Sequence, residues 1–170
     1  MNVFIIAAQS ADGFIARNSN EPSINWTSKE DKEFFQERTK KAGVIVVGSK
    51  TFATFRKPLP DRLNIVYTRH PEKIPISRVI RTSSLPPEEL IRQLEKERYS
   101  EVAVCGGSQI YTMFMEAGVV NKLYLTVEPM LFGKGIKLFD KAAERRLELV
   151  QVKNLNRYTL LLEYNLLWSN

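Results

Sequence analysis

The chain has 170 residues, of which 44% are hydrophobic and 26% charged, and its formal net charge is +6. This length and balance predict a single folded domain over residues 1–170 with a sizeable core, and they argue against disorder. No apolar run is long enough to span a membrane, so we expect no membrane partner. Lys and Arg alternate with Asp and Glu along the chain, which disfavours a nucleic-acid partner and suits small polyanionic ligands better.

The chain contains one cysteine, Cys105, and one histidine, His70. This composition excludes an intrachain disulfide, a Cys/His zinc site and a triad built on histidine, and we expect no metal. The first residues lack the basic stretch that precedes the apolar part of a signal peptide. We therefore expect a cytoplasmic protein.

Strand-like apolar runs alternate along the chain with helical patterns. The predicted strands cover 3–8, 43–48, 63–68, 78–82, 101–107 and 122–129, and the predicted helices cover 28–41, 86–98 and 108–118, with a further helix start after Gly48. Two more strand-like runs, 146–155 and 157–167, resemble a closing antiparallel pair. The alternation predicts an α/β domain whose sheet is mainly parallel with an antiparallel edge.

Three of the predicted strands end in residues suited to phosphate. Free N–H groups and the helix dipole favour anions after a strand–glycine–helix joint, and a hydroxyl beside a guanidinium could hold a further phosphate. The residues are Gly48, Lys50 and Thr51 at the first end, Gly106, Gly107 and Ser108 at the second, and Thr68 and Arg69 at the third. Each joint alone is also typical of ordinary turns, but together they favour a long, multiply phosphorylated ligand. The fingerprint G-x-G-x-x-G is absent, so a Rossmann domain is not supported.

Asp31 stands at the start of the predicted helix 28–41, on the side that should face the core. One interpretation is a capping box with Ser28, in which the carboxylate satisfies backbone donors and the helix dipole. In the other interpretation Glu30 completes a box with Thr27, and Asp31 is kept among aromatic side chains such as Trp26. An unpaired carboxylate is costly there, so it would serve a ligand with adjacent N–H donors.

Several blocks of the chain resemble the dihydrofolate reductase family. They are "IIAAQSADGFIA", "NWTSKEDKEFF", "VVGSKTFATFRKPLPDRLNIVYTR", "VCGGSQIYTMF" and "KLYLT", which occur in the family's order over about residues 1–128. The resemblance implies the three-layer α/β/α fold of that family. Its central mixed sheet has about eight strands, mainly parallel with an antiparallel C-terminal edge, and about four helices flank it.

The resemblance implies an NADPH-dependent enzyme that reduces 7,8-dihydrofolate to tetrahydrofolate, with hydride passing from nicotinamide C4 to pterin C6 and a proton to N5. Asp31 would bind the pterin, with Thr126 hydrogen-bonded to its carboxylate and Trp26 completing the catalytic group. The implied pterin pocket comprises Ile6, Ala8, Phe35, Phe55 and Cys105, and Arg62 would take the carboxylate of the glutamate tail. The implied NADPH site comprises Ala8, Ile15, Gly48, Lys50, Thr51, Thr68, Arg69, Gly106, Gly107, Ser108, Gln109, Ile110 and Tyr111. Within it, Thr68 and Arg69 would recognise the 2′-phosphate.

Three departures from the family pattern leave alternatives open. The loop "ARNSNEPSIN" is longer than usual, and Phe52 replaces a tryptophan. After Thr126, "VEPMLFGKGIKLFD" is more similar to the reductase of riboflavin biosynthesis, so reduction of 5-amino-6-(5-phosphoribosylamino)uracil or the related diaminopyrimidine is an alternative. That pathway's deaminase zinc motif is absent. A non-catalytic NADP(H)-binding protein is a second alternative, and the chain is expected to be a monomer or a homodimer.

Overall fold

The computed structural model describes residues 1–55 and 57–168, and its centre is an eight-stranded sheet in the order β5-β4-β3-β6-β1-β7-β10-β9. The strands of this sheet are β1 (Asn2–Ser10), β3 (Val44–Gly48), β4 (Leu63–Tyr67), β5 (Ile80–Ser83), β6 (Glu101–Val104), β7 (Lys122–Glu128), β9 (Arg146–Asn154) and β10 (Leu160–Leu167). All pairings from β5 to β7 are parallel, and β10 pairs antiparallel with both β7 and β9. The predicted mixed sheet with an antiparallel C-terminal edge is confirmed.

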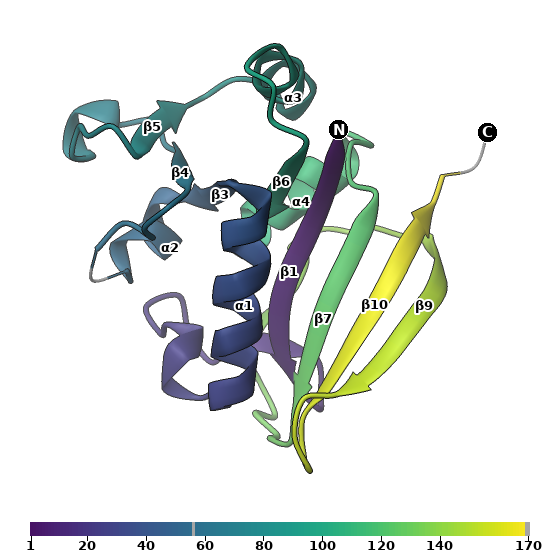
Figure 1. Ribbon diagram of the computed structural model, residues 1–170. Helices are drawn as coiled ribbons and strands as arrows, with labels where there is room; N and C mark the ends of the chain where they lie inside the picture. Colours follow the sequence, from purple (N-terminus) through teal and green to yellow (C-terminus); the bar gives the residue numbers. More distant parts are fainter. Residues whose placement is uncertain (56, 169–170) are drawn as a thin grey trace.

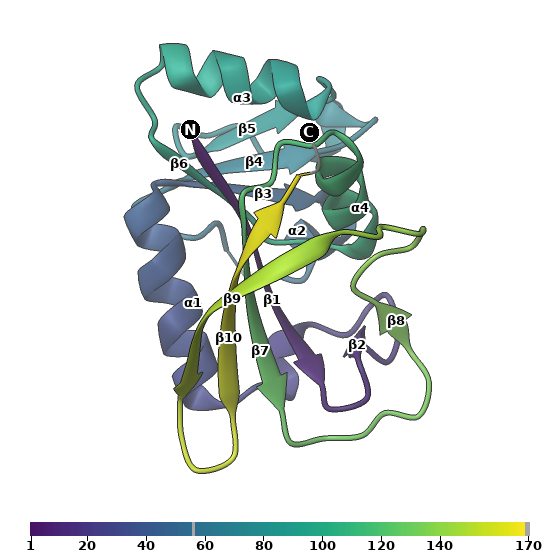
Figure 2. The same cartoon turned by 90° about the vertical axis from the view of Figure 1, so that its right-hand side faces the viewer.

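Helices cover both faces of the sheet, as the three-layer prediction required. The α-helices are α1 (Lys29–Ala42), α2 (Ser49–Ala53), α3 (Pro87–Lys96) and α4 (Ser108–Glu116). Helix α1 runs along one face, and α4 lies against the opposite face (Figures 1 and 2). Each helix presents apolar side chains to the strand residues that point toward it, which buries the sheet between two cores.

The two cores differ in their helical partners. One contains Leu90 and Leu94 of α3 with Phe114 of α4, all at most 1% exposed. The other lies under α1 and α2, where Phe35 and Phe52 pack against the sheet. The central strand β3 contributes to both cores and is fully buried over 44–47, which explains its uninterrupted run of Val and Ile.

Short elements depart from the sequence prediction. Strands β2 (Phe14–Ala16) and β8 (Ile136–Lys137) pair in a separate two-stranded sheet, and 3-10 helices η1 (Ser23–Asn25) and η2 (Pro71–Lys73) lie in connections. None of these has enough residues to show a hydrophobic period, so the pattern could not indicate them. Within the described residues, no helix has the length and apolar composition needed to cross a membrane.

Candidate functional site

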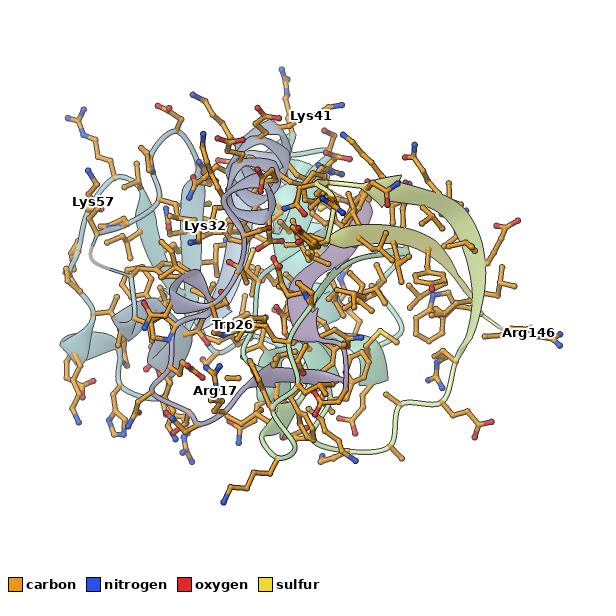
Figure 3. All side chains as sticks on the ribbon, turned by 90° about the horizontal axis from the view of Figure 1, so that it is seen from below. Arg17, Trp26, Lys32, Lys41, Lys57 and Arg146 are labelled. Carbon is orange, nitrogen blue, oxygen red and sulfur yellow. The ribbon has the colours of Figure 1, made fainter. Side chains whose placement is uncertain are left out.

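A cavity of about 1550 Å³ opens at the carboxyl ends of the parallel strands. Ligands bind at this end in open α/β sheets, because the loops that follow adjacent strands meet there. Figure 3 views the molecule from this side, with Trp26 near the middle and Lys32 and Lys57 toward the side of α2. The volume exceeds the range of about 300–1,000 Å³ that is typical of small-molecule pockets, so a large ligand or two ligands would fit.

One half of the cavity is formed by three strand ends in register. Gly48 of β3 lies beside Tyr67 of β4, and Tyr67 lies beside Ser83 of β5. All three residues line the cavity, as do Thr68 and Arg69, which follow β4 directly. Thr68 is tied to the β5 edge by its N–H, which donates to the Ser83 carbonyl at 3.2 Å.

Asp31 lies on the wall of the other half, in the first turn of α1. Ser28 is the N-cap of this helix, and its Oγ accepts from the Asp31 N–H at 3.2 Å. The Glu30 carboxylate instead accepts from Asn156 Nδ2 at 2.8 Å. Ser28 therefore caps α1 through its own hydroxyl, and the Asp31 side chain faces the cavity.

Burial raises the pKa of the Asp31 carboxyl above its ordinary value, and the negative charge of Glu128 raises it further. Hydrogen bonding from the hydroxyls of Thr126 and Thr27, together with the charge of Lys32, partly offsets the rise in this pKa. The opposing effects leave a carboxyl that is desolvated on one side and hydrogen-bonded on the other. Such a group can exchange a proton with a ligand under milder conditions than an exposed aspartate.

Glu128 holds the start of α1 in place through hydrogen bonds. This buried residue at the end of β7 accepts from the Ser28 N–H through Oε1 at 2.7 Å and from Thr159 Oγ1 through Oε2 at 2.9 Å. Asn156 in the β9–β10 turn accepts from the Thr159 N–H and donates to Glu30. A continuous set of hydrogen bonds thus fixes the turn that carries Asp31.

Replacing Glu128 with Gln is expected to lower the pKa of Asp31. The amide can still accept from the Ser28 N–H and can donate to the Thr159 hydroxyl, so the substitution removes the charge and keeps the contacts. Carbon-13 NMR titration of the Asp31 carboxyl in both proteins measures the difference. An unchanged or higher pKa in Glu128→Gln would contradict the electrostatic role. Glu163→Gln, in the middle of β10 and paired with Lys122, is the control.

The turn between β6 and α4 brings two glycines against the cavity. Gly106 has φ +110°, and a Cβ there would lie 3.0 Å from Tyr111 Oη. A Cβ on Gly107 would lie 3.1 Å from Thr51 Oγ1. The peptide bond between the two glycines is cis. Side chains at these positions would crowd the wall of the cavity, so glycine allows a ligand to approach the backbone closely.

Two hydroxyl groups of α4 serve different purposes. Tyr111 is buried, and its Oη donates to the Ile6 carbonyl at 2.9 Å. Burial holds the pKa of Tyr111 well above its usual range, so the phenol remains a neutral donor. The Ser108 Oγ is also buried but has no hydrogen-bond partner among the described residues, and it lies on the cavity wall. An unpaired hydroxyl at a helix start is available to a ligand.

The structure brings most of the predicted site residues to this one cavity. Those that line it are Ile6, Ala8, Ile15, Asp31, Phe35, Gly48, Lys50, Thr51, Phe55, Thr68, Arg69, Cys105, Gly106, Gly107, Ser108, Gln109, Ile110 and Tyr111. Trp26, Thr126 and Arg62 lie outside the lining. Thr126 still acts on Asp31 through its hydroxyl, as described above.

Arg62 differs most from its predicted role. Its guanidinium is buried and donates to the Pro60 carbonyl, to the carbonyl and Oε1 of Gln36, and to Thr39 Oγ1. A buried guanidinium needs acceptors on all sides, and α1 supplies them. Cations that do line the cavity include Lys32 and Lys57.

Trp26 is buried under the long loop that precedes α1. Its ring meets Phe132 edge-on with centroids 5.1 Å apart, and its Nε1 has no partner within the part of the chain that the structure describes. The loop itself contributes Asn18, Ser19 and the residues from Glu21 to Asn25 to the cavity wall. The lengthened loop therefore adds surface to the cavity, and the buried indole N–H beside it can be satisfied by a water.

Several residues that line the cavity were not identified from the sequence alone. Tyr67 and Ser83 occupy strand ends, where the rule that ligands bind at carboxyl ends could have indicated them. Lys32 and Gln36 are one helical turn apart on α1, each next in sequence to Asp31 or Phe35. This i, i+4 spacing could have indicated that they share a side of the helix near the cavity. Phe139 and Asp140 enter the cavity from the segment after β8, which has no periodic pattern.

An open α/β sheet with its cavity at the carboxyl ends of parallel strands defines the class of α/β proteins that bind their ligands at this edge of the sheet. A model of the dihydrofolate reductase family matches residues 2–157. The chain belongs to the dihydrofolate reductase family, and thus to the oxidoreductases. The dihydrofolate reductase of Buchnera aphidicola subsp. Baizongia pistaciae is 30% identical over 135 residues, which cover 78% of this chain and 75% of that protein.

Two solved structures illustrate the similarity in fold. Dihydrofolate reductase from Enterococcus faecalis, complexed with NADP(H) and RAB-propyl, has a TM-score of 0.70 and 25% identity, covering 97% of this chain and 96% of that one. RibD of Acinetobacter baumannii has a TM-score of 0.81 and 17% identity, covering 98% of this chain and 58% of that one. Both likenesses agree with the fold.

Proposed function

We propose that the protein is an NADPH-dependent reductase that converts 7,8-dihydrofolate to tetrahydrofolate. The observation that carries this proposal is the position of Asp31. Its carboxyl lies on the wall of a large cavity, and burial raises the pKa of this carboxyl. Its neighbours in the lining include Ile6, Ala8 and Phe35, which suit a flat heterocycle. A pterin offers adjacent N–H groups that can share one carboxylate through paired hydrogen bonds.

The rest of the cavity fits a phosphorylated dinucleotide. Gly107 allows close approach of a phosphate at the start of α4, where the Ser108 hydroxyl is unpaired. Lys50 and Arg69 are exposed cations on the same wall. When bound, NADPH would supply the hydride, while the protein contributes position and electrostatics.

Residues of the chain would orient the substrate and deliver the proton. Asp31 would orient the pterin and support protonation at N5 through a water, because a carboxylate that holds the 2-amino group is out of reach of N5. Thr126 would keep the carboxylate oriented by its hydroxyl. The unpaired Trp26 N–H is a donor that could hold such a water. Tyr111, neutral and fixed to the Ile6 carbonyl, would shape the wall beside the nicotinamide.

A direct experiment is the oxidation of NADPH by the purified protein, followed by the loss of nicotinamide absorbance, with dihydrofolate as acceptor. Turnover that depends on dihydrofolate is the expected result. The same assay with 5-amino-6-(5-phosphoribosylamino)uracil tests the second candidate. Binding of NADPH without oxidation by either substrate would contradict both reductase activities and favour a non-catalytic binding protein.

The second candidate, a riboflavin-type pyrimidine reductase, is favoured by the segment after β7. "EPMLFGKGIKLFD" resembles that kind of reductase, and residues 135–137 of this segment line the cavity through β8. This reaction would require a site for the substrate's phosphate and would not require Asp31. Comparison of wild type and Asp31→Asn with the pyrimidine substrate therefore separates the two candidates.

Replacing Arg69 with Ala is expected to weaken NADPH binding by about 10-fold to 100-fold and to leave NADH binding unchanged. Charge-assisted hydrogen bonds to a phosphate contribute about 1.5–3 kcal/mol, and only NADPH carries the 2′-phosphate. Calorimetric titration with both cofactors measures the difference. Arg92→Ala, on the exposed side of α3, is the matched control. An equal loss for both cofactors would exclude the role assigned to Arg69.

A further inference from the structure

Tyr67, the last residue of β4, has a buried hydroxyl without a hydrogen-bond partner. Its side chain is 8% exposed, and its Oη has no partner among the residues that the structure describes. Most buried hydroxyls in folded proteins are hydrogen-bonded, because an unpaired one costs free energy. Burial raises the pKa of Tyr67 to about 12, so near neutral pH the phenol keeps its proton and can donate it to an acceptor.

The residues around Tyr67 do not supply the missing partner. The Ser83 hydroxyl is near enough to offset part of the rise in the pKa of Tyr67, but no hydrogen bond joins the two groups. Ser83 Oγ instead accepts from the Leu85 N–H at 3.2 Å. On its apolar side the Tyr67 ring meets Phe114 of α4 edge-on, with ring centroids 5.8 Å apart. Tyr67 belongs to this core and also lines the cavity, so a partner for its hydroxyl can come from the cavity side.

The wall of the cavity beside Tyr67 is apolar with a few hydroxyl groups. Ile110 lines the cavity one helical turn before Phe114, the residue that contacts the Tyr67 ring. Ile110 also covers Gly48, the neighbour of Tyr67 in the sheet, since a Cβ on Gly48 would lie 3.1 Å from Ile110 Cγ1. Ser83, on the other side of Tyr67 in the sheet, brings a further hydroxyl to the lining. Apolar walls with a small number of placed polar groups suit a flat nitrogenous ring.

The position of Tyr67 in the chain indicates which ring this would be. Thr68 and Arg69 follow Tyr67 directly, and they are the residues proposed for the 2′-phosphate of NADPH. The adenine base is attached to C1′ of the same ribose, next to the carbon that carries this phosphate. A base in this place has ring nitrogens that can accept from a neutral phenol.

We propose that Tyr67 helps to determine cofactor binding by donating a hydrogen bond from its hydroxyl to the adenine base. The contact rests on the proposed function, because it takes a nicotinamide adenine dinucleotide as the ligand. It differs from the role of Arg69 in one measurable respect. NADH and NADPH carry the same base, so Tyr67 contributes equally to both, whereas Arg69 contributes to NADPH alone.

Tyr67→Phe tests the contact, because it removes the hydroxyl and keeps the ring. The variant should bind NADPH and NADH more weakly by the same factor, about 5-fold to 10-fold, as expected for the loss of one hydrogen bond. Calorimetric titration of the wild type and the variant with each cofactor measures both factors. Tyr164→Phe is the matched control, since Tyr164 packs against the same core but lies outside the lining of the cavity.

Urea denaturation without cofactor separates a ligand contact from a contact within the fold. Tyr67→Phe removes an unpaired hydroxyl, so its unfolding midpoint should equal or exceed that of the wild type. Tyr111→Phe removes a hydroxyl that donates to the Ile6 carbonyl, and its midpoint should fall. Saturating NADPH should raise the midpoint of the wild type more than that of Tyr67→Phe.

Equal affinity of the wild type and Tyr67→Phe for NADPH would overturn the contact and assign the hydroxyl to a water only, while the proposed reductase activity would stand. A loss for NADPH alone would also overturn it, because the hydroxyl would then contact the 2′-phosphate. A lower midpoint of Tyr67→Phe without cofactor would overturn it by showing that the hydroxyl is paired within the protein. A wild type that binds neither cofactor would overturn both the contact and the proposed function. Weaker binding of both cofactors by Tyr67→Phe, without turnover of dihydrofolate by the wild type, would support the contact and refute the proposed reaction.

Discussion

Asp31→Asn should lower NADPH-dependent reduction of dihydrofolate by about 10²–10⁴-fold, the usual contribution of a positioned acid or base. The amide cannot share a charge with the pterin or support proton delivery. Asn is close in size to Asp, so the cavity keeps its shape. Steady-state and single-turnover measurements with saturating cofactor give the effect on the chemical step.

The variant should remain folded, and the pKa of Asp31 predicts the direction in which its free energy of unfolding changes. Because this pKa is raised on folding, the protonated carboxyl is favoured in the folded state, and its ionisation costs stability. The cost appears as pH rises from the unfolded-state pKa through the folded-state pKa. Asp31→Asn removes the cost, so its free energy of unfolding at neutral pH should equal or exceed that of the wild type.

Glu33→Gln is the matched control for Asp31→Asn. Glu33 belongs to the same helix, but its side chain is exposed and contacts Lys29. Its substitution should change turnover little. Wild-type turnover in Asp31→Asn would mean that the carboxylate is not used in the reaction, and the dihydrofolate proposal would then fail.

Gly106→Ala is expected to reduce the free energy of unfolding by on the order of 3 kcal/mol. The backbone φ of +110° disfavours any side chain, and the new Cβ would lie 3.0–3.2 Å from three atoms of the Tyr111 ring and hydroxyl. Tyr111 is buried and fixed by its hydrogen bond to the Ile6 carbonyl, so it cannot move away freely. Urea denaturation measures the loss, and cofactor titration should show weaker binding.

Gly13→Ala separates the cost of a positive φ from the cost of contact with Tyr111. Gly13 also has a positive φ, +88°, but a Cβ there meets no atom within 4 Å. It should cost about 1–2 kcal/mol, the usual penalty for a side chain in this region. A loss in Gly106→Ala no larger than that in Gly13→Ala would show that contact with Tyr111 is unimportant.

The long elements of the fold could be predicted from sequence because their side chains have a clear period. The apolar run at β3 and the amphipathic pattern of α3 indicated their types, with boundaries off by one or two residues. Strand β6 ends at Val104 and not at Gly107, because the glycines turn away from the sheet toward α4. Strands β2 and β8 were not predicted, because strands of two or three residues form only where the fold places two segments side by side.

The candidate site could be predicted only where its residues have a local sequence pattern. Strand-end glycines and the carboxylate of Asp31 carry their chemistry in local sequence, and the cavity brings them together. The contacts of Arg62 could not be predicted, because two of its acceptors belong to Gln36, 26 residues earlier in the chain. The part played by Glu128 was also hidden, since it contacts Ser28 across a separation of 100 residues.

The sequence by itself determined the family, the order of the strands and helices, and the residues that we propose for binding phosphate and a heterocycle. These properties depend on side-chain type and short spacings. The tertiary structure alone decided which of those groups face one cavity, which buried charge fixes the start of α1, and which strands form the edges of the sheet. Such facts arise from contacts between segments far apart in the chain, where packing and desolvation set the environment of each group.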